Sequence, residues 1–244
     1  MKARSVLLKL CGLLLLGRSE LPVCAAAEAL KIDPSYAGLQ GEVLLDNARV
    51  LVQKFIVEPG QSTGRHSHPA DQLLVFIKGG VLKSQATARS TLWRDGRVVW
   101  QNGSDPADEG STNTGAAQIV MDLVTLKPVA AAAAPEGGPK YHYLNYPNIP
   151  GEDVLENEQV IVQRFTIKPG QWEGVHAHCP DMLYIHIKGG QWAGKTHQQP
   201  ERPDSKPSAD GEVGWMPTID INVGHQSHNI GKSPIDLIWV TLKN

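Results

Sequence analysis

Two stretches decide how this chain folds: PGQSTGRHSH at residues 59–68 and PGQWEGVHAH at residues 169–178. The agreement continues upstream, where LDNARVLVQKF at 45–55 aligns with LENEQVIVQRF at 155–165 at the same offset of 110 residues. A period this long with two copies indicates a duplicated domain and not a solenoid of short repeats.

The two copies differ in length after their Lys-Gly-Gly triplets at 78–80 and 188–190. The closing stretches MDLVTLK at 121–127 and IWVTLKN at 238–244 align at an offset of 116, so the second copy has gained six residues. Most of the gain falls in the polar stretch THQQPERPDSKPSADG at 196–211. We expect this stretch to form a mobile loop beside the second domain.

The first 27 residues have the pattern of an export signal. Lys2 and Arg4 precede the apolar run VLLKLCGLLLLG, and Ala25 to Ala27 offer a small-residue cleavage site. A membrane anchor is the alternative, but a span needs about 20 apolar residues. This run is shorter and is interrupted by Lys9. The sequence therefore predicts a signal peptide at 1–27 and a secreted or periplasmic protein.

The composition after signal removal excludes some classes of partner. The segment carries four of the 23 basic residues and one of the 25 acidic ones, so the remainder has a net charge of about −5. Such a chain lacks the basic footprint of a nucleic-acid-binding protein, and we expect no membrane span in it. Cys179 is then the single cysteine, so no intramolecular disulfide can form.

The remaining sequence is typical of short strands joined by Pro-Gly and Gly-Gly turns, without sustained helical periodicity. We therefore expect an all-β chain with domains at 28–127 and 141–244, joined by the Ala/Pro/Gly linker PVAAAAAPEGGPK at 128–140. The expected strands are rich in β-branched residues and lie at Val50–Val57, Leu73–Lys78, Ile119–Leu126, Val160–Ile167, Leu183–Lys188 and Ile235–Leu242.

Each copy carries a His-x-His pair that could hold a metal ion. Alternate residues of a strand share a face, so His66 points with His68 and His176 points with His178. Two imidazoles on one face can bind one ion if the strand edges a barrel mouth. A single pair of this kind is more often structural or exposed, so the surrounding residues have to decide.

The spacing around both pairs resembles the first motif of the cupin superfamily, G-x5-H-x-H-x3,4-E-x6-G. His225 and Asn229 match the H-x3-N end of the second cupin motif, although the preceding P-x-G is not reproduced. The positions that match the first motif are Gly60, His66, His68, Gln72 and Gly79 in the first copy, and Gly170, His176, His178, Met182 and Gly189 in the second. The resemblance implies two tandem antiparallel β-barrels of the cupin type, also called a double-stranded β-helix or jelly roll.

The resemblance also implies a metal site in the second barrel, with His176, His178 and His225 as ligands. The usual Glu position holds Met182, so the site has no carboxylate and favours Lewis-acid chemistry or an anionic substrate. Asp181 is adjacent but is expected on the opposite face from Met182. The implied cofactor is one divalent transition metal (Fe, Mn, Zn, Ni or Cu), with a candidate second ion in the first barrel.

In the first barrel the corresponding set is His66, His68 and Glu109, with Gln72 at the usual Glu position. Two histidines and one carboxylate form the pattern of non-haem Fe(II) oxygenases. The alignment passes through the loop QNGSDPADEG at 101–110, where a shift of one residue would replace Glu109 by Asp108.

Further residues of the second copy are candidates for the pocket. Alternation from Met182 points Tyr184 and His186 inward as general acids or bases, where the first copy has Leu74 and Phe76. The alternative is that both rings fill the barrel floor. Trp172 is the candidate for lining the mouth. Alternation places Cys179 on the other face as a buried or idle thiol, and His228 is expected to be structural.

We therefore expect an exported, metal-dependent enzyme with its chemistry in the second barrel. Dioxygenation of a small organic molecule is the first expectation, because open metal sites suit oxygen chemistry and several cupins with two barrels are oxygenases. The alternative is a non-catalytic protein that binds a metal or a small ligand. A homodimer is a candidate assembly, because cupins often dimerise.

Overall fold

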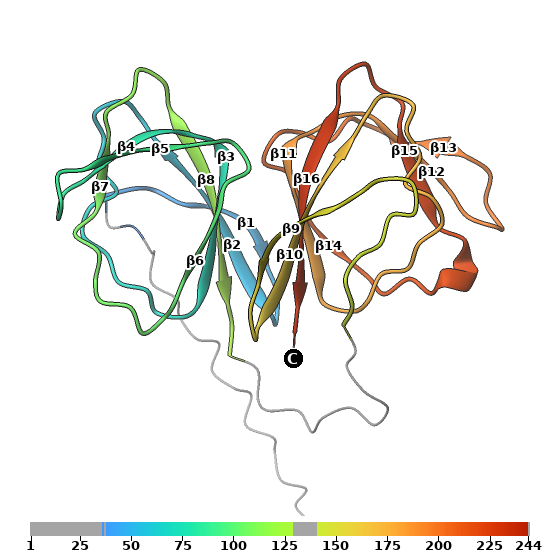
Figure 1. Cartoon of the computed structure of the whole chain (residues 1–244), viewed down its shortest axis with the longest axis horizontal. Coiled ribbons are helices and arrows are strands. Elements are labelled where there is room, and N and C mark those ends of the chain that lie inside the picture. Colours follow the sequence, from blue (N-terminus) through green and yellow to red (C-terminus); the bar gives the residue numbers. More distant parts are fainter. Residues whose placement is uncertain (1–35, 37, 129–140, 244) are drawn as a thin grey trace, which may run out of the picture. The chain divides into compact units, whose positions relative to one another are not determined.

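The computed structural model describes residues 36, 38–128 and 141–243. These residues form 16 strands and one short 3-10 helix, η1 (Ile221–Val223), and none of their helices is long and apolar enough to cross a membrane. The expected signal peptide at 1–27 and nearly all of the expected linker at 128–140 lie outside the described residues. The all-β prediction is confirmed (Figure 1).

The first barrel consists of two antiparallel sheets. One sheet has five strands in the order β1-β2-β8-β3-β6, and the other has three in the order β5-β4-β7. The strands are β1 (Glu42–Asp46), β2 (Val50–Val57), β3 (Gln72–Lys78), β4 (Gly80–Ser84), β5 (Ser90–Trp93), β6 (Val98–Gln101), β7 (Ser111–Asn113) and β8 (Ile119–Leu126).

The second barrel repeats this topology strand for strand. Its sheets have the orders β14-β11-β16-β10-β9 and β13-β12-β15. The strands are β9 (Glu152–Glu156), β10 (Val160–Ile167), β11 (Met182–Lys188), β12 (Trp192–Lys195), β13 (Arg202–Pro203), β14 (Val213–Met216), β15 (Gln226–Asn229) and β16 (Ile235–Leu242).

All six strands expected from the sequence are present. Four have the expected bounds, and β3 and β11 each begin one residue earlier than expected. These six strands lie in the five-stranded sheets and are buried along most of their length, so β-branched runs mark them clearly. The shorter strands of the three-stranded sheets are more polar and were not individually predicted.

The histidine pairs lie outside the regular strands. The expectation that each pair sits in a strand was wrong, because the segments before β3 and β11 make only isolated bridges, such as His66 with Asp108 and His178 with Ile219. These segments are extended, so the two rings of each pair still lie near each other.

Three apolar clusters stabilise the described chain. One fills the interior of the first barrel around Phe55, and one fills part of the second around Phe165. The third joins the outer faces of both five-stranded sheets and includes Ile77 of the first barrel and Ile187 of the second. Both barrels accordingly fall in one compact unit, Ile32–Asn244.

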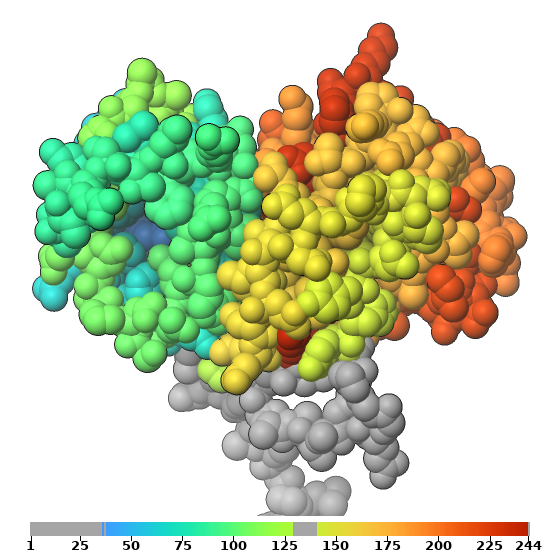
Figure 2. Space-filling view, viewed as in Figure 1, coloured from blue at the N-terminus to red at the C-terminus, as the bar shows by residue number. Residues whose placement is uncertain are grey.

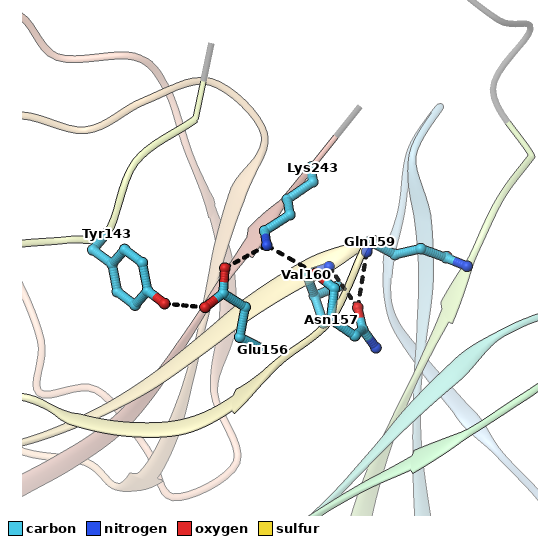
Figure 3. Close-up of polar contacts among 6 residues, drawn as sticks. All are labelled: Tyr143, Glu156, Asn157, Gln159, Val160 and Lys243. Atoms are coloured by element: carbon cyan, nitrogen blue, oxygen red, sulfur yellow. Dashed lines mark hydrogen bonds and ion pairs between the residues drawn. The ribbon is translucent and has the colours of Figure 1, made fainter. Parts of the chain in front are cut away.

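Polar contacts at the edge of the shared cluster follow the repeat. Arg49 of the first barrel pairs with Asp181 of the second, and Gln159 of the second bonds to Asp71 of the first. Arg49 aligns with Gln159 and Asp71 with Asp181, so one contact is the counterpart of the other. Figure 3 shows the turn that carries Gln159.

The C-terminal strand is fixed at the same turn. Lys243 donates to the carboxylate of Glu156 and to the backbone oxygen of Asn157, and Tyr143 donates to the other oxygen of Glu156 (Figure 3). On the face drawn in Figure 2, the first barrel is hollowed, and the yellow-green segment that leads into β9 covers part of the second. Leu144, Tyr146 and Ile149 of this segment are buried in the second barrel's core.

Candidate metal centre and pocket

Three histidines of the second barrel converge on one point. The ligand atoms of His176, His178 and His225 lie within 4.8 Å of one another, and no other such group of three or more His, Cys, Asp or Glu exists among the described residues. The Nε2 atoms of His176 and His178 are 2.8 Å apart. The ring centroid of His225 lies 4.9 Å from that of His176.

Local backbone structure orients the rings of His176 and His225. The Nδ1 atom of His176 lies 2.9 Å from the carbonyl oxygen of Gly174. Because a carbonyl oxygen can only accept a hydrogen bond, Nδ1 carries the proton and Nε2 presents a lone pair. His225 follows η1, which ends at Gly224 in the left-handed conformation (φ 66°). The turn at Gly224 brings His225 beside His176, whose backbone N–H donates to the His225 oxygen at 3.2 Å.

Burial keeps the three rings neutral. Desolvation lowers the pKa of His176 to about 4 and that of His178 to about 3, and it also lowers the pKa of His225. At neutral pH each ring therefore keeps the lone pair that a metal ligand needs.

The donor set fits a divalent transition metal. Two nitrogens at about 2.0–2.1 Å from one ion, at a right angle, would be about 2.9 Å apart, close to the observed separation of His176 and His178. Imidazole suits Fe, Ni, Cu and Zn alike, so the donor set leaves the identity of the metal open.

A pocket of about 270 Å³ adjoins the cluster. His178 and His225 line it together with Tyr184 and His186, the two residues that were expected to point inward. Its aromatic walls come from Trp192 and Trp239 and not from Trp172, so the prediction for Trp172 was wrong. Trp172 instead stacks on His228 with the ring centroids 3.9 Å apart.

Several residues that line the pocket differ from those at the paired positions of the first copy. In the first barrel Phe76 stacks on Trp93, with ring centroids 4.8 Å apart, and fills the interior. The repeat aligns these positions with His186 and Ser208, whose polar atoms lie 3.3 Å apart. The second barrel has no stacked aromatic pair at these positions, and His186 and Ser208 line its pocket instead.

A second exchange accommodates Tyr184. Leu74 pairs with Val99 across β3 and β6, and the corresponding pair across β11 and β14 is Tyr184 with Gly214. A Cβ atom at Gly214 would lie 2.3 Å from the Tyr184 ring, so the large side chain requires the glycine. This small–large exchange could not be predicted without knowing the strand pairing.

Glu173 is a pocket residue that the sequence analysis missed. It is 4% exposed, lines the pocket, and accepts a hydrogen bond from the backbone N–H of Ser227 at 3.0 Å. Burial, only partly offset by hydrogen bonds from Tyr146 and Ser227, raises the pKa of this carboxyl to about 7. The signal was present in the repeat, because Glu173 stands where the first copy has Thr63.

The first-barrel candidates do not assemble into a comparable set. The rings of His66 and His68 are 5.3 Å apart, and His68 Nδ1 lies 3.1 Å from Gln72 Oε1. Glu109 is exposed and pairs with Arg65, so the expected set of two histidines and this carboxylate is not formed. The Asp108 carboxylate, the other alignment, accepts from the Gly110 N–H instead.

The remaining candidates of the second copy serve structural contacts. The carboxylate of Asp181 pairs with Arg49, and the buried thiol of Cys179 lies 3.8 Å from the His142 oxygen. His228 pairs with Glu201 in addition to its stacking on Trp172. None of the three belongs to the histidine cluster.

The polar stretch at 196–211 is mostly loop and turn, as expected, but it also contributes to the pocket. β13 pairs with β12, and the backbone N–H of Asp204 donates to the Trp192 oxygen at 2.9 Å. Asp204 and Ser208 line the pocket. Most of the gain in length therefore lies in a segment that forms one wall of the candidate site.

Comparisons with known proteins support the fold. A scan of family models and a search of curated proteins find no match. The putative glyoxylate-induced protein of Pseudomonas aeruginosa has a TM-score of 0.58 and 12% identity, over 86% of this chain and 83% of its own. AerE from Microcystis aeruginosa has a TM-score of 0.54 and 14% identity, over 88% and 95%.

The oxalate decarboxylase of Lactobacillus farciminis, in complex with formate, has a TM-score of 0.51 and 15% identity, over 81% of this chain and 78% of its own. Such identities establish the fold and not the activity. The predicted fold is confirmed: the chain forms two tandem antiparallel β-barrels of the cupin type. Its second barrel carries a histidine cluster that could hold a metal.

Proposed function

We propose that the second barrel binds one divalent transition metal through His176, His178 and His225 and catalyses the dioxygenation of a small organic molecule. The observation that supports this is the convergence of three neutral imidazoles beside a pocket of about 270 Å³. A bound metal would supply Lewis-acid polarisation and open coordination positions for oxygen and substrate. The pocket is below the usual range for drug-sized ligands, which favours a small substrate.

The chain's own residues would handle protons. The Tyr146 hydroxyl accepts from Trp239 Nε1 at 2.9 Å, so its own proton is directed to Glu173. The Ser227 N–H donates to one Glu173 oxygen, and together these contacts fix the carboxyl in the pocket wall. Glu173 can then hold or release a proton next to a bound substrate, while Tyr184 and His186 offer polar contacts farther along the wall.

A second candidate reaction is metal-assisted proton transfer without oxygen, as in an isomerase or a lyase. The observation that favours it is Glu173, because such reactions need an acid–base group positioned beside the metal-bound substrate. Export, expected from residues 1–27, is part of the proposal for either reaction.

Metal analysis tests the proposed site. The purified protein, offered Fe, Mn, Ni, Cu and Zn in turn, should retain about one ion per chain by mass spectrometry of the metals. His176→Ala and His225→Ala should each lower metal retention at least about tenfold, because a three-ligand site loses a third of its donors. His228→Ala and His66→Ala are matched controls that should retain the ion. Unchanged retention in both cluster variants would show that the assignment is wrong.

Oxygen uptake then separates the reactions. Metal-dependent oxygen consumption with a catechol, a flavonol or a small thiol would support dioxygenation. Substrate conversion that continues without oxygen would favour proton transfer instead. A protein that binds the metal and converts none of these compounds would support the non-catalytic alternative.

A further inference from the structure

Two carboxylates at the end of the pocket have no counter-charge. Asp204, at the exposed rim, and Glu212 both line the pocket, whereas no lysine or arginine among the described residues does. Neither carboxylate forms an ion pair within residues 36, 38–128 and 141–243. One oxygen of Glu212 accepts a hydrogen bond from the Ala209 N–H at 3.0 Å, but a backbone N–H does not neutralise the charge, so the two carboxylates attract a cation.

The charges of the two carboxylates influence the ionisable groups around them. Burial, followed by the charge of Glu212, raises the pKa of Asp204 above its ordinary value. Burial and the charges of Glu212 and Asp204 likewise raise the pKa of Tyr184. The negative field of both groups therefore reaches the interior of the pocket.

This charge belongs to the second barrel alone. The backbone oxygen of Glu212 accepts from the His186 N–H, and in the first barrel the same contact joins Arg97 to Phe76. Glu212 thus stands where the first barrel has a cation, and Asp204 lies in the segment that has gained residues. Both acidic side chains accompany the exchanges that open the pocket.

A series of ring contacts connects the metal ligands to the carboxylates along the pocket wall. Successive ring contacts run from His178 to Trp239 (5.1 Å), to Tyr184 (5.4 Å), to His186 (5.3 Å) and to Trp192 (6.2 Å). The backbone N–H of Asp204 donates a hydrogen bond to the backbone oxygen of Trp192, the last ring of this series. Aromatic faces beside carboxylates are the surroundings that favour an ammonium or guanidinium group.

We propose that the substrate is a small bipolar molecule with an ammonium or similar cationic group at Asp204 and Glu212 and a metal-binding donor, such as a carboxylate, at the histidines. This inference rests on the proposed metal site. It refines the expectation of an anionic substrate, because the pocket favours an anion at the histidine end only. Tyr184 and Trp192 would contact the connecting carbons and the cation.

Matched pairs of small ligands test the proposal. The probes are ω-amino acids from glycine to 5-aminopentanoate, each compared with the carboxylic acid that lacks the amine. Calorimetry on the zinc-loaded protein should show at least one chain length whose amino acid binds about tenfold tighter or more, as one charge-assisted hydrogen bond can provide. Asp204→Asn and Glu212→Gln should remove this preference without loss of zinc. Glu201→Gln, an exposed carboxylate of the same segment outside the pocket, should keep it.

The outcomes separate this proposal from that of the metal site. Equal binding of both members at every chain length, or a preference that survives in both pocket variants, would overturn the bipolar substrate while zinc retention stays intact. If the protein retains no metal, butylamine and 1-butanol test the acidic end alone. Tighter binding of butylamine that is lost in Glu212→Gln would support the cation site, and equal binding would refute it.

Discussion

At the scale of single residues, Asp122 is an acidic side chain buried next to an apolar cluster. It is fully buried in β8, opposite Val75 of the shared apolar cluster, and neither of its carboxylate oxygens has a hydrogen-bond partner among the described residues. The repeat aligns it with Ile238, a member of the same cluster. Burial raises the pKa of Asp122 to about 7.

This pKa makes stability depend on pH. The unfolded chain releases the Asp122 proton near pH 4 and the folded chain near pH 7. Stability contributed by this group should therefore fall as pH rises through that window, by up to about 4 kcal/mol. Asp122→Asn removes the titration, so its stability relative to the wild type should increase from pH 5 to pH 8 in urea unfolding.

The exposed control Glu58→Gln should show a constant difference from the wild type over the same range. A stability difference for Asp122→Asn that stays constant or shrinks with rising pH would contradict the buried, unpaired carboxyl.

At the scale of elements, the pairing of β11 with β14 decides the shape of the pocket. Gly214→Val, which restores the residue found at Val99, should push the Tyr184 ring out of its place and destabilise the fold by about 1–3 kcal/mol. In the Tyr184→Leu background the same change recreates the Leu74–Val99 pair, so its cost should be smaller. Chemical denaturation of the four proteins measures the coupling, and equal costs in both backgrounds would exclude the proposed clash.

At the scale of the whole molecule, the cluster shared by both five-stranded sheets couples the barrels. Ile77 and Ile187 occupy equivalent positions in this cluster, one from each copy. We expect one cooperative thermal transition, and Ile77→Ala and Ile187→Ala should each lower its midpoint by the equivalent of about 2–5 kcal/mol. Calorimetry showing two transitions, each moved by only one of the variants, would mean that the barrels unfold independently.

Part of the site was readable from the sequence because it depends on short spacing. The histidine pairs, the third histidine and the inward Tyr184 and His186 follow from motif spacing and strand alternation. Glu173 was also visible, as a departure of one copy from the other, but its burial was not. The place of Glu109 depended on a loop, and in the structure its carboxylate is exposed and pairs with Arg65.

By itself, the sequence determined the duplication, the six long strands and the difference in candidate site residues between the two copies. Each of these follows from local spacing and alternation. Only the tertiary structure decided where the pocket lies and how its charge is distributed. The pocket depends on contacts between residues that are distant in sequence or brought together by strand pairing. These are Ser208 with His186, Gly214 with Tyr184, and Asp204 with Glu212. A side chain's neighbours across a sheet depend on register and loop path, and these are fixed only when the barrels close.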